Sequence, residues 1–360
     1  MVLRPSSRTK FRVFTGKAYR TPVVLFLLAA GVPFVVSVAF FVISQRRSLL
    51  TEPETYTEAL KRTGSASYMI SLSAWKHFLA HDPLCRGAEA IVIGSSRVRE
   101  IDATVVGTSV CNLYVNGLRL PGFAHLAQDL APMAPGQHQV VYVGIDHFGL
   151  WLDTDHFDSL ELKLLSKSRT LWKVWAAVMR PLDFFTISDL LEAIRRYRSG
   201  SARFEEQSNI YYPDGHVFHP QYYAQKRAGI HRSFRQQDLD RDAAAMLGGG
   251  WLRESNLRAL ETGVRLLHAK GYAVRVFWNP VPSAHIASAR HRFPVFFQEA
   301  IDALDRLAPM LPLDRYLPAS QTLDASQFGC TEGDYFDTTH IDVDCMRRMF
   351  AVAFRHAHAQ

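Results

Sequence analysis

Residues 90–100, AIVIGSSRVRE, form a short apolar run that stops at a glycine, two serines and an arginine. A run of about four to eight apolar and β-branched residues bounded by turn residues is typical of a buried strand. Gly94, Ser95 and Ser96 therefore stand at the predicted carboxyl end of a strand. In the simplest interpretation they form a strand-to-helix turn in which a serine caps the following helix.

The same pattern, a short strand that ends at small or polar residues, recurs further along the chain. It is found in segments 108–117 (TSVCNLYVNG), 138–148 (HQVVYVGIDHF) and 272–282 (YAVRVFWNPVP). Helical spacing is found at 66–80, 121–132, 254–271 and 294–308, and a last helix is predicted after His340. Short buried strands that alternate with helices predict the α/β class with a doubly wound parallel sheet.

The predicted strand ends carry the polar residues of a candidate site. In doubly wound sheets, ligands bind in the crevice outside the carboxyl ends of the strands. We therefore expect one crevice to be lined by Ser95, Ser96, Asn116, Gly117, Asp146 and Asn279.

Residues 151 to about 250 interrupt the alternation and are interpreted as a mixed insertion. They contain a predicted helix near 186–198 and the hairpin-like segment 210–220, IYYPDGHVFHP, whose Asp-Gly pair favours a tight turn. We expect this insertion to pack over or beside the crevice, where it either contacts the substrate or serves as a structural flap.

The positive charge of the chain is concentrated at its N-terminus. The formal net charge is +7, but residues 1–47 hold eight Lys or Arg and no acid, which leaves 33 basic against 34 acidic residues in the remainder. A protein that binds nucleic acid needs a basic surface on its folded domain, so nucleic acid is excluded as a partner.

An apolar segment, residues 21–44, predicts a membrane anchor. Its 24 residues carry no charge. A helix of this length can cross a hydrocarbon core of about 30 Å. Six of the eight basic residues precede it, so the N-terminus is expected in the cytoplasm. A cleaved signal peptide that ends near SVA at 37–39 is the alternative.

The predicted organisation follows from this anchor. Residues 1–20 are a basic cytoplasmic tail, 21–44 a single transmembrane helix, 45–80 a polar juxtamembrane segment followed by a helix, and 81–360 the main domain. The protein is expected in the inner membrane, with this domain on the periplasmic, extracytoplasmic side. Its four cysteines can pair there in three ways, and both the pairing Cys85–Cys111 with Cys330–Cys345 and four free thiols remain open.

Segment 333–342, GDYFDTTHID, supplies the partners that a catalytic serine needs. A serine hydroxyl becomes a good nucleophile when a histidine accepts its proton and an acid orients that histidine. Asp337 precedes His340 by three residues, so its carboxylate can reach Nδ1 and leave Nε2 to face a serine. Asp334 is a second candidate for the acid.

Gly-x-Ser after the first strand, together with Asp-x-x-His near the end, resembles the SGNH (GDSL-type) hydrolase and acyltransferase superfamily. IVIGSSRV, NLYVNG, VVYVGIDHF and VFWNPV are most similar to membrane-anchored bacterial members such as the alginate O-acetylation and teichoic-acid D-alanylation proteins. The resemblance covers about residues 85–150 and 255–350. It implies a triad of Ser96, His340 and Asp337.

The resemblance also implies an oxyanion hole, built from the backbone N–H groups of Ser96 and Gly117. The family's third strand normally ends in Gly-x-Asn, whose side-chain amide is a further donor, but here Asp146 takes that place. An ionised carboxylate would repel an oxyanion. Either Asp146 is protonated or structural, or Asn116 or Asn279 supplies the amide, or the activity is weak.

Two functions therefore remain open. The first is a membrane-anchored extracytoplasmic serine esterase or O-acyltransferase that acts on a cell-envelope carbohydrate. The second is a non-catalytic SGNH-like accessory protein that binds an envelope polysaccharide or an integral-membrane acyltransferase. No cofactor or metal is predicted, since the histidines of the middle region lack the regular spacing of a zinc site (His147, His156, His216, His219).

Overall fold

The computed structural model describes residues 53–66, 72–147, 149–150, 168, 209–230, 234–247 and 252–354. The predicted cytoplasmic tail, the predicted transmembrane helix at 21–44 and the predicted helix near 186–198 lie outside these residues. Among the described helices, none combines the length and the apolar character that a membrane span requires.

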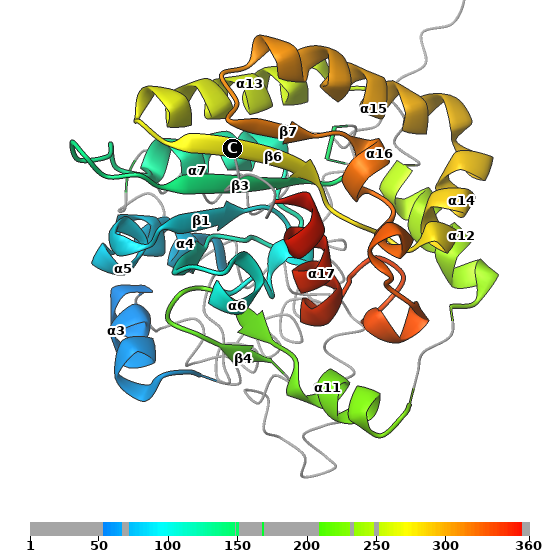
Figure 1. Ribbon diagram of the computed structural model, residues 1–360, viewed down its shortest axis with the longest axis horizontal. Helices are drawn as coiled ribbons and strands as arrows, with labels where there is room; N and C mark the ends of the chain where they lie inside the picture. Colours follow the sequence, from blue (N-terminus) through cyan, green and yellow to red (C-terminus); the bar gives the residue numbers. More distant parts are fainter. Residues whose placement is uncertain are drawn as a thin grey trace, which may run out of the picture.

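The sheet has five strands, all parallel, in the order β2-β1-β3-β6-β7 (Figure 1). Their bounds are β1 Ala90–Ile93, β2 Val110–Asn112, β3 Val140–Ile145, β6 Ala273–Trp278 and β7 Arg315–Leu317. The predicted α/β class with a parallel sheet is confirmed, and β7 is a strand that the sequence pattern did not indicate. Because the chain moves outward from β1 to β2 and then returns to the other side of β1, the strand order reverses between β1 and β3. A crevice is expected at this point.

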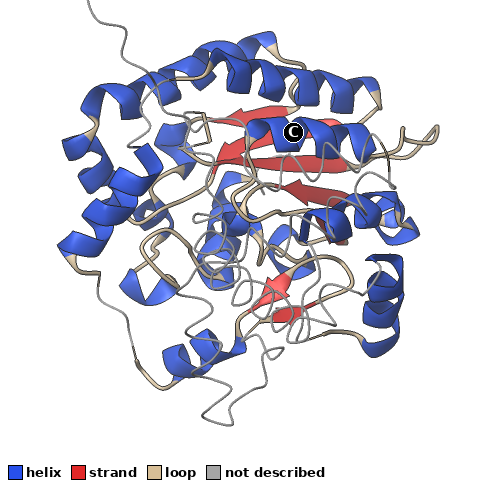
Figure 2. Ribbon diagram, turned by 180° about the vertical axis from the view of Figure 1, so that it is seen from behind, coloured by secondary structure: helices blue, strands red, loops and turns tan. Residues whose placement is uncertain are grey.

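Helices cover both faces of the sheet, as the opposite views of Figures 1 and 2 show. On one face, the Tyr142 ring of β3 lies 5.3 and 5.0 Å from Phe350 and Phe354 at the end of α17 (Val343–Ala353). On the other face, α13 (Glu254–Ala269) packs closely against α7 (Leu120–Asp129). A Cβ at position 263 would overlap the Phe123 ring, so this contact requires Gly263. The remaining described elements of this part of the chain are α5 Pro83–Gly87, η2 Ser96–Val98, α6 Ala103–Val106, α14 Ser283–Arg292, α15 Pro294–Leu307, η3 Ala308–Met310, α16 Ala319–Thr322, η4 Ala325–Phe328 and η5 Glu332–Asp334.

The helix expected within residues 66–80 is present as α4 (Leu72–His81), and the polar segment before it also contains a helix, α3 (Pro53–Thr63). Tyr56 and Leu60 of α3 are fully buried, and the Tyr56 ring meets the ring of Trp75 edge-on at 5.3 Å. These apolar side chains pack into the domain core, so α3 and α4 belong to the folded domain.

The insertion carries the predicted hairpin, with β4 at Ile210–Tyr211 and β5 at Val217–Phe218. Gly215 in its turn has φ +92°, a conformation that strongly favours glycine. The buried Lys76 ammonium donates hydrogen bonds to the carbonyl oxygens of Gly215 and Asn112, so it joins the hairpin to β2. The chain then continues through α11 (Pro220–Arg227) and α12 (Gln236–Leu247).

Both expected cysteine pairs form. Cys85 of α5 is joined to Cys111 of β2, and Cys330 is joined to Cys345 of α17. The second bridge encloses the segment that holds Asp337 and His340.

Candidate active site

The two serines after β1 have different roles. Gly94 and Ser95 lead from the strand into η2, and the Ser95 hydroxyl accepts a hydrogen bond from the Arg97 backbone N–H at 3.3 Å. Ser95 is thus the helix cap that the simplest interpretation of this segment requires. Ser96, the next residue, turns its side chain toward a different part of the chain.

The Ser96 hydroxyl meets His340, 244 residues away in the sequence. Its Oγ lies 2.7 Å from Nε2 of His340, and Nδ1 of the same ring lies 2.8 Å from the Asp337 carboxylate. The structure therefore brings Ser96, His340 and Asp337 together. A serine, a histidine and an acid in this order and at these distances can activate the hydroxyl as a nucleophile.

A short turn fixes the Asp337 carboxylate against its histidine. One of its oxygens accepts the backbone N–H groups of Thr339 and His340, at 2.8 and 2.9 Å. Phe336 donates its own N–H to the His340 carbonyl oxygen at 2.9 Å, which closes the turn. The local spacing of Asp-x-x-His is sufficient to form this part of the site.

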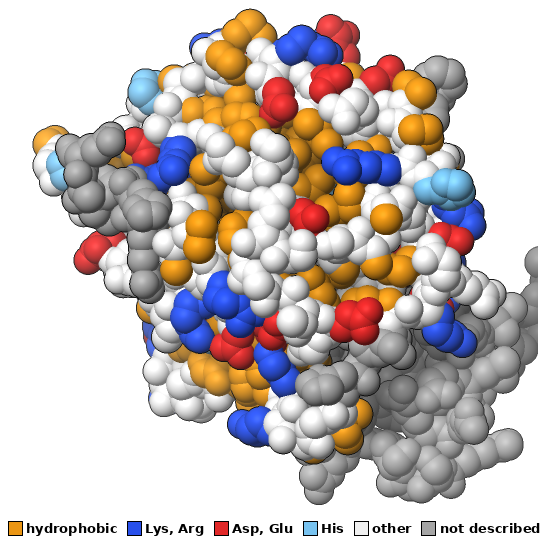
Figure 3. All heavy atoms as spheres, turned by 45° about the vertical axis from the view of Figure 1, so that its right-hand side comes forward, with side chains coloured by type: hydrophobic (Ala, Val, Ile, Leu, Met, Phe, Trp, Pro, Cys, Tyr) orange, Lys and Arg blue, Asp and Glu red, His pale blue; other side chains and the backbone are white. Residues whose placement is uncertain are grey.

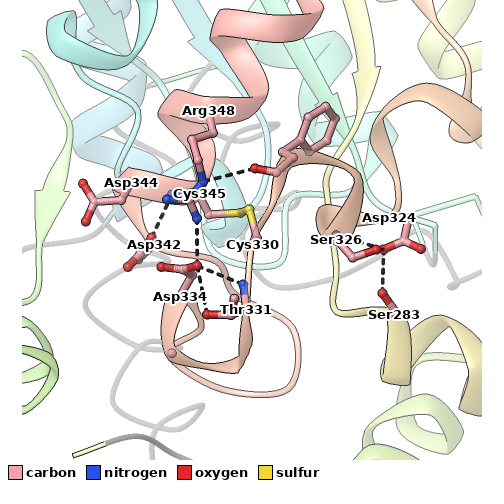
Figure 4. The surroundings of a disulfide bond; sticks show 12 residues. Ser283, Asp324, Ser326, Cys330, Thr331, Asp334, Asp342, Asp344, Cys345 and Arg348 are labelled. Carbon is pink, nitrogen blue, oxygen red and sulfur yellow. Dashed lines mark hydrogen bonds and ion pairs between the residues drawn. A yellow bond between two sulfur atoms is a disulfide. The ribbon is translucent and has the colours of Figure 1, made fainter. Parts of the chain in front are cut away.

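Asp334, the second candidate acid, anchors the turn. Its carboxylate accepts the Thr331 N–H at 2.9 Å and pairs with Arg348 at 2.7 Å, beside the Cys330–Cys345 bridge (Figure 4). It also pairs with Lys226 of α11 at 2.8 Å. Asp337, rather than Asp334, contacts the imidazole.

Burial and neighbouring charges set the protonation of the triad. Burial lowers the pKa of His340 below its ordinary 6.5, and the Asp337 carboxylate only partly offsets this. The positive charges of Arg99 and Arg97 lower it further. Burial acts to raise the pKa of Asp337, but the hydrogen bond and charge of His340 outweigh it, and this pKa lies below its usual range. A neutral imidazole beside an ionised carboxylate is the state in which His340 can accept a proton.

Asp146 forms a buried ion pair. Its carboxylate accepts hydrogen bonds from Arg97 at 2.9 Å and from the Asn279 amide at 2.8 Å, and the side chains of the ion pair are each only 2% exposed. Arg97 in turn donates its Nε–H to the Thr339 carbonyl oxygen at 3.0 Å. Asp146 is therefore structural, one of the alternatives that the sequence left open, and the Asn279 amide is bound to it.

Close packing at the ends of β1 and β3 requires glycine. A Cβ on Gly144 would overlap the Asn279 side chain and the Val98 side chain. Gly94 is also tight, since its Cβ would lie 2.9 Å from Val98 and 3.1 Å from the Gly144 carbonyl oxygen. These two glycines let the turn of Ser96 approach the pair formed by Asp146 and Asn279.

Asn116 and Gly117 follow β2 and lie beside the turn of Ser96. Val115 donates its N–H to the Gly94 carbonyl oxygen at 3.0 Å, which places the next two residues next to Ser95 and Ser96. Gly117 has φ +61°, and Asn116 is exposed. Within the described part of the chain, the backbone N–H groups of Ser96 and Gly117 donate no hydrogen bond.

A pocket of about 260 Å³ adjoins the triad at Asp337. The insertion supplies much of its wall through α11 and the residue before it, which fits the expected position of the insertion beside the crevice. The sequence pattern did not single out this pocket or the roles of Arg97 and Arg99, although both arginines stand in the quoted segment. Its lining residues are Arg99, His219, Gln221, Tyr222, Gln225, Phe336 and Asp337.

The histidines considered as metal ligands are distributed over several sites. His147 faces His285 at 3.2 Å, His219 contacts Glu100 at 2.9 Å, and His216 contacts Asp214, while His156 lies outside the described residues. Among the residues that the structure describes, no group of three His, Cys, Asp or Glu side chains could hold a metal ion.

Comparison of the chain with models of known protein families and with curated proteins found no match.

Asp146→Asn should lower the free energy of unfolding by about 3 kcal/mol, because Arg97 would lose its carboxylate partner in a buried position. Urea denaturation measures this change. The double variant Arg97→Gln/Asp146→Asn removes both charges and should regain part of the loss. An Asp146→Asn protein as stable as the wild type would show that Arg97 does not depend on this carboxylate.

Nuclear magnetic resonance titration of His340 should give a pKa below 6.5, because burial and two arginines disfavour the charged ring. Asp337→Asn should lower this pKa further, since it removes a group that raises it. Arg99→Gln should raise it, since it removes a positive charge. Shifts of the same sign in both variants would contradict this account of the site.

Proposed function

We propose that the chain is a serine esterase or O-acyltransferase of the SGNH type, in which Ser96 is the nucleophile. The observation that carries the proposal is the contact of the Ser96 hydroxyl with His340 Nε2 at 2.7 Å, on the ring whose Nδ1 faces Asp337 at 2.8 Å. A serine that only caps a helix needs neither partner. The doubly wound sheet, with Ser96 after β1 and His340 before the last described helix, agrees with the SGNH resemblance.

The geometry supports a two-step acyl transfer. Ser96 Oγ attacks the ester carbonyl carbon while His340 Nε2 accepts the hydroxyl proton, and the imidazolium then gives this proton to the departing alcohol oxygen. The acyl-serine is released when water or a carbohydrate hydroxyl attacks it, with His340 again as the base. Asp337 stabilises the imidazolium through its charge and does not take the proton.

The negative charge that develops on the carbonyl oxygen needs donors. The backbone N–H groups of Ser96 and Gly117 are available for this role, and the exposed Asn116 amide follows β2 at the same edge. We infer that these three residues form the oxyanion hole. Asp146 does not count against it, because its charge is paired with Arg97.

We also propose that the domain works on the extracytoplasmic side of the inner membrane, anchored by residues 21–44. Two disulfides support this location, since such bridges persist mainly in oxidising compartments. On the face drawn in Figure 3, basic and acidic side chains are interspersed, which suits a carbohydrate polymer better than nucleic acid.

The alternative, an accessory protein without catalysis, was suggested by Asp146 in place of an amide. Because this carboxylate is paired with Arg97 and Asn279, it gives no reason to prefer that alternative. The decision between the two functions rests on the reactivity of Ser96.

Ser96→Ala and His340→Ala should each lower kcat on a small acetyl ester by about 10⁴-fold or more, and the double variant should lose little more, because the two groups act as a unit. Asp337→Asn should lower kcat less than Ser96→Ala or His340→Ala does. A fluorophosphonate probe should label the wild type and not Ser96→Ala.

The matched control is Ser95→Ala, which changes the neighbouring hydroxyl and should leave probe labelling in place. A folded wild type that is neither labelled nor active on esters would favour the accessory function.

The predicted anchor places the C-terminal domain outside the cytoplasm. A reporter enzyme that works only outside the cytoplasm should therefore be active when fused after Gln360, and one that works only inside should be inactive. Paired fusions to one enzyme that works outside and one that works inside the cytoplasm measure this. Activity of the cytoplasmic reporter would overturn the proposed location and, with it, the envelope substrate.

A further inference from the structure

Arg99 is a cation at the wall of the pocket beside the triad. It follows η2, and its guanidinium lies over the Phe336 ring, 5.2 Å from the ring centroid. Phe336 and Asp337 belong to the turn that carries His340, and both line the same pocket. The pocket therefore connects the catalytic turn with Arg99.

The Arg99 guanidinium has no anionic partner among the residues that the structure describes. Its Nε is buried and makes no hydrogen bond there. Burying such a group without a partner costs free energy, since the lost water contacts are not replaced. Arg97, two residues earlier, shows the opposite case, since it pairs with Asp146. An unpaired guanidinium in a cavity beside a triad is what a site for a negatively charged ligand group requires.

We propose that this pocket binds a carboxylate on the alcohol side of the substrate, with Arg99 as the cation that pairs with it. The inference rests on the proposed function, because it assigns a substrate class to the same site. Arginine suits this role, since its planar fork can hold both oxygens of a carboxylate.

The charges around the pocket favour an anion with a single charge. Burial, together with the charges of Arg99 and His340, lowers the pKa of His219 to about 3, so this ring is neutral at pH 7. Asp337 adds negative charge at the rim. One cation beside a carboxylate matches a monoanion, and a phosphate monoester with nearly two charges would meet more repulsion.

The position of the pocket indicates the alcohol side of the ester. The departing alcohol, or the hydroxyl that accepts the acyl group, must contact His340 Nε2, because this nitrogen gives or takes its proton. Phe336 and Asp337 lie in the turn that leads to His340 and line the pocket, so we infer that a group attached to that alcohol extends into it. At about 260 Å³, the pocket is below the roughly 300 to 1,000 Å³ of sites for drug-sized ligands, so it suits one small unit.

The other polar side chains of the pocket wall are suited to hydroxyl groups. Gln221, Tyr222 and Gln225 come from α11 and carry amides and a phenol without formal charge. The two amides can donate and accept hydrogen bonds, while the Tyr222 hydroxyl, which already donates to the Gly333 carbonyl oxygen at 2.8 Å, can accept one from a hydroxylated carboxylate ligand. The pocket thus combines one charged contact with several neutral ones.

The test compares two acetyl esters that differ in charge, 4-acetoxybenzoate and its neutral methyl ester. Relative to their hydrolysis in buffer, the wild type should favour the charged ester by about ten- to a hundredfold in kcat/KM, the usual effect of one charge-assisted hydrogen-bonded pair. Arg99→Gln should abolish this preference, measured as the ratio of kcat/KM for the two esters, so that any change it makes to His340 affects both esters and cancels. Arg99→Lys should retain part of it.

The matched control is Arg315→Gln, which removes the same charge from the edge strand β7, separated from β1 by β3 and β6. It should keep the preference of the wild type. A wild type that shows no preference for the charged ester would overturn the inference. Faster cleavage of 4-acetoxyphenyl phosphate than of 4-acetoxybenzoate would overturn the assignment of a single charge.

A second measurement does not depend on catalysis. Calorimetry on Ser96→Ala should show binding of 4-hydroxybenzoate that Arg99→Gln weakens by about tenfold or more, while methyl 4-hydroxybenzoate is unaffected. If Ser96 proves unreactive but this binding remains, the proposed function fails and the pocket assignment stands. Esterase activity with no binding that depends on Arg99 would overturn the pocket assignment alone.

Discussion

The buried ion pair between Arg97 and Asp146 is the interaction on which the rest of the site depends. Arg97 belongs to the helical turn after β1, Asp146 directly follows β3, and the Arg97 Nε–H donates to the backbone of Thr339, the residue before His340. One guanidinium therefore joins three segments that are far apart in the sequence. Burying two charges is costly, and their attraction offsets this cost only if the geometry is good and further hydrogen bonds complete it. The Asn279 amide provides one of these for the carboxylate.

This constraint explains the composition of the segment at the end of β1. Ser95 caps the turn, Ser96 faces His340, and Arg97 holds the histidine turn against β3. Val98 packs where Gly94 and Gly144 leave space for it. Each residue of the tight turn points in a different direction, so consecutive positions serve different purposes.

The two residues that follow extend the site toward the insertion. Arg99 lines the pocket, while Glu100 accepts the Tyr223 hydroxyl at 2.6 Å and contacts His219 at 2.9 Å. Burial raises the pKa of Glu100 to about 8, so it is largely protonated at pH 7 and adds little negative charge behind Arg99. The Cys330–Cys345 bridge ties the segment before the histidine turn to α17, and Lys226 of α11 pairs with Asp334 and Asp342 on either side of that turn. The pocket wall and the triad are therefore parts of one connected structure.

Much of the fold could be predicted from local pattern. The strands β1, β3 and β6, the long helices α13 and α15 and the hairpin of the insertion follow from hydrophobic periodicity and turn residues, which act over a few neighbouring positions. The core helix α3 was missed, because its polar composition gave no sign that Tyr56 and Leu60 would be buried against α4. β7 was missed because it is short and lies at the edge of the sheet.

The sequence by itself determined the contact between Asp337 and His340, because three residues of spacing in a turn are enough to form it. It also indicated Ser96, through its place at a strand end. Only the tertiary structure decided that Ser96 and His340 meet across 244 residues, and that Asp146 pairs with Arg97. The pocket around Arg99 likewise arises only when the insertion packs against the histidine turn. These features depend on how distant elements pack, and burial of a charge or an unpaired donor cannot be read from spacing along the chain.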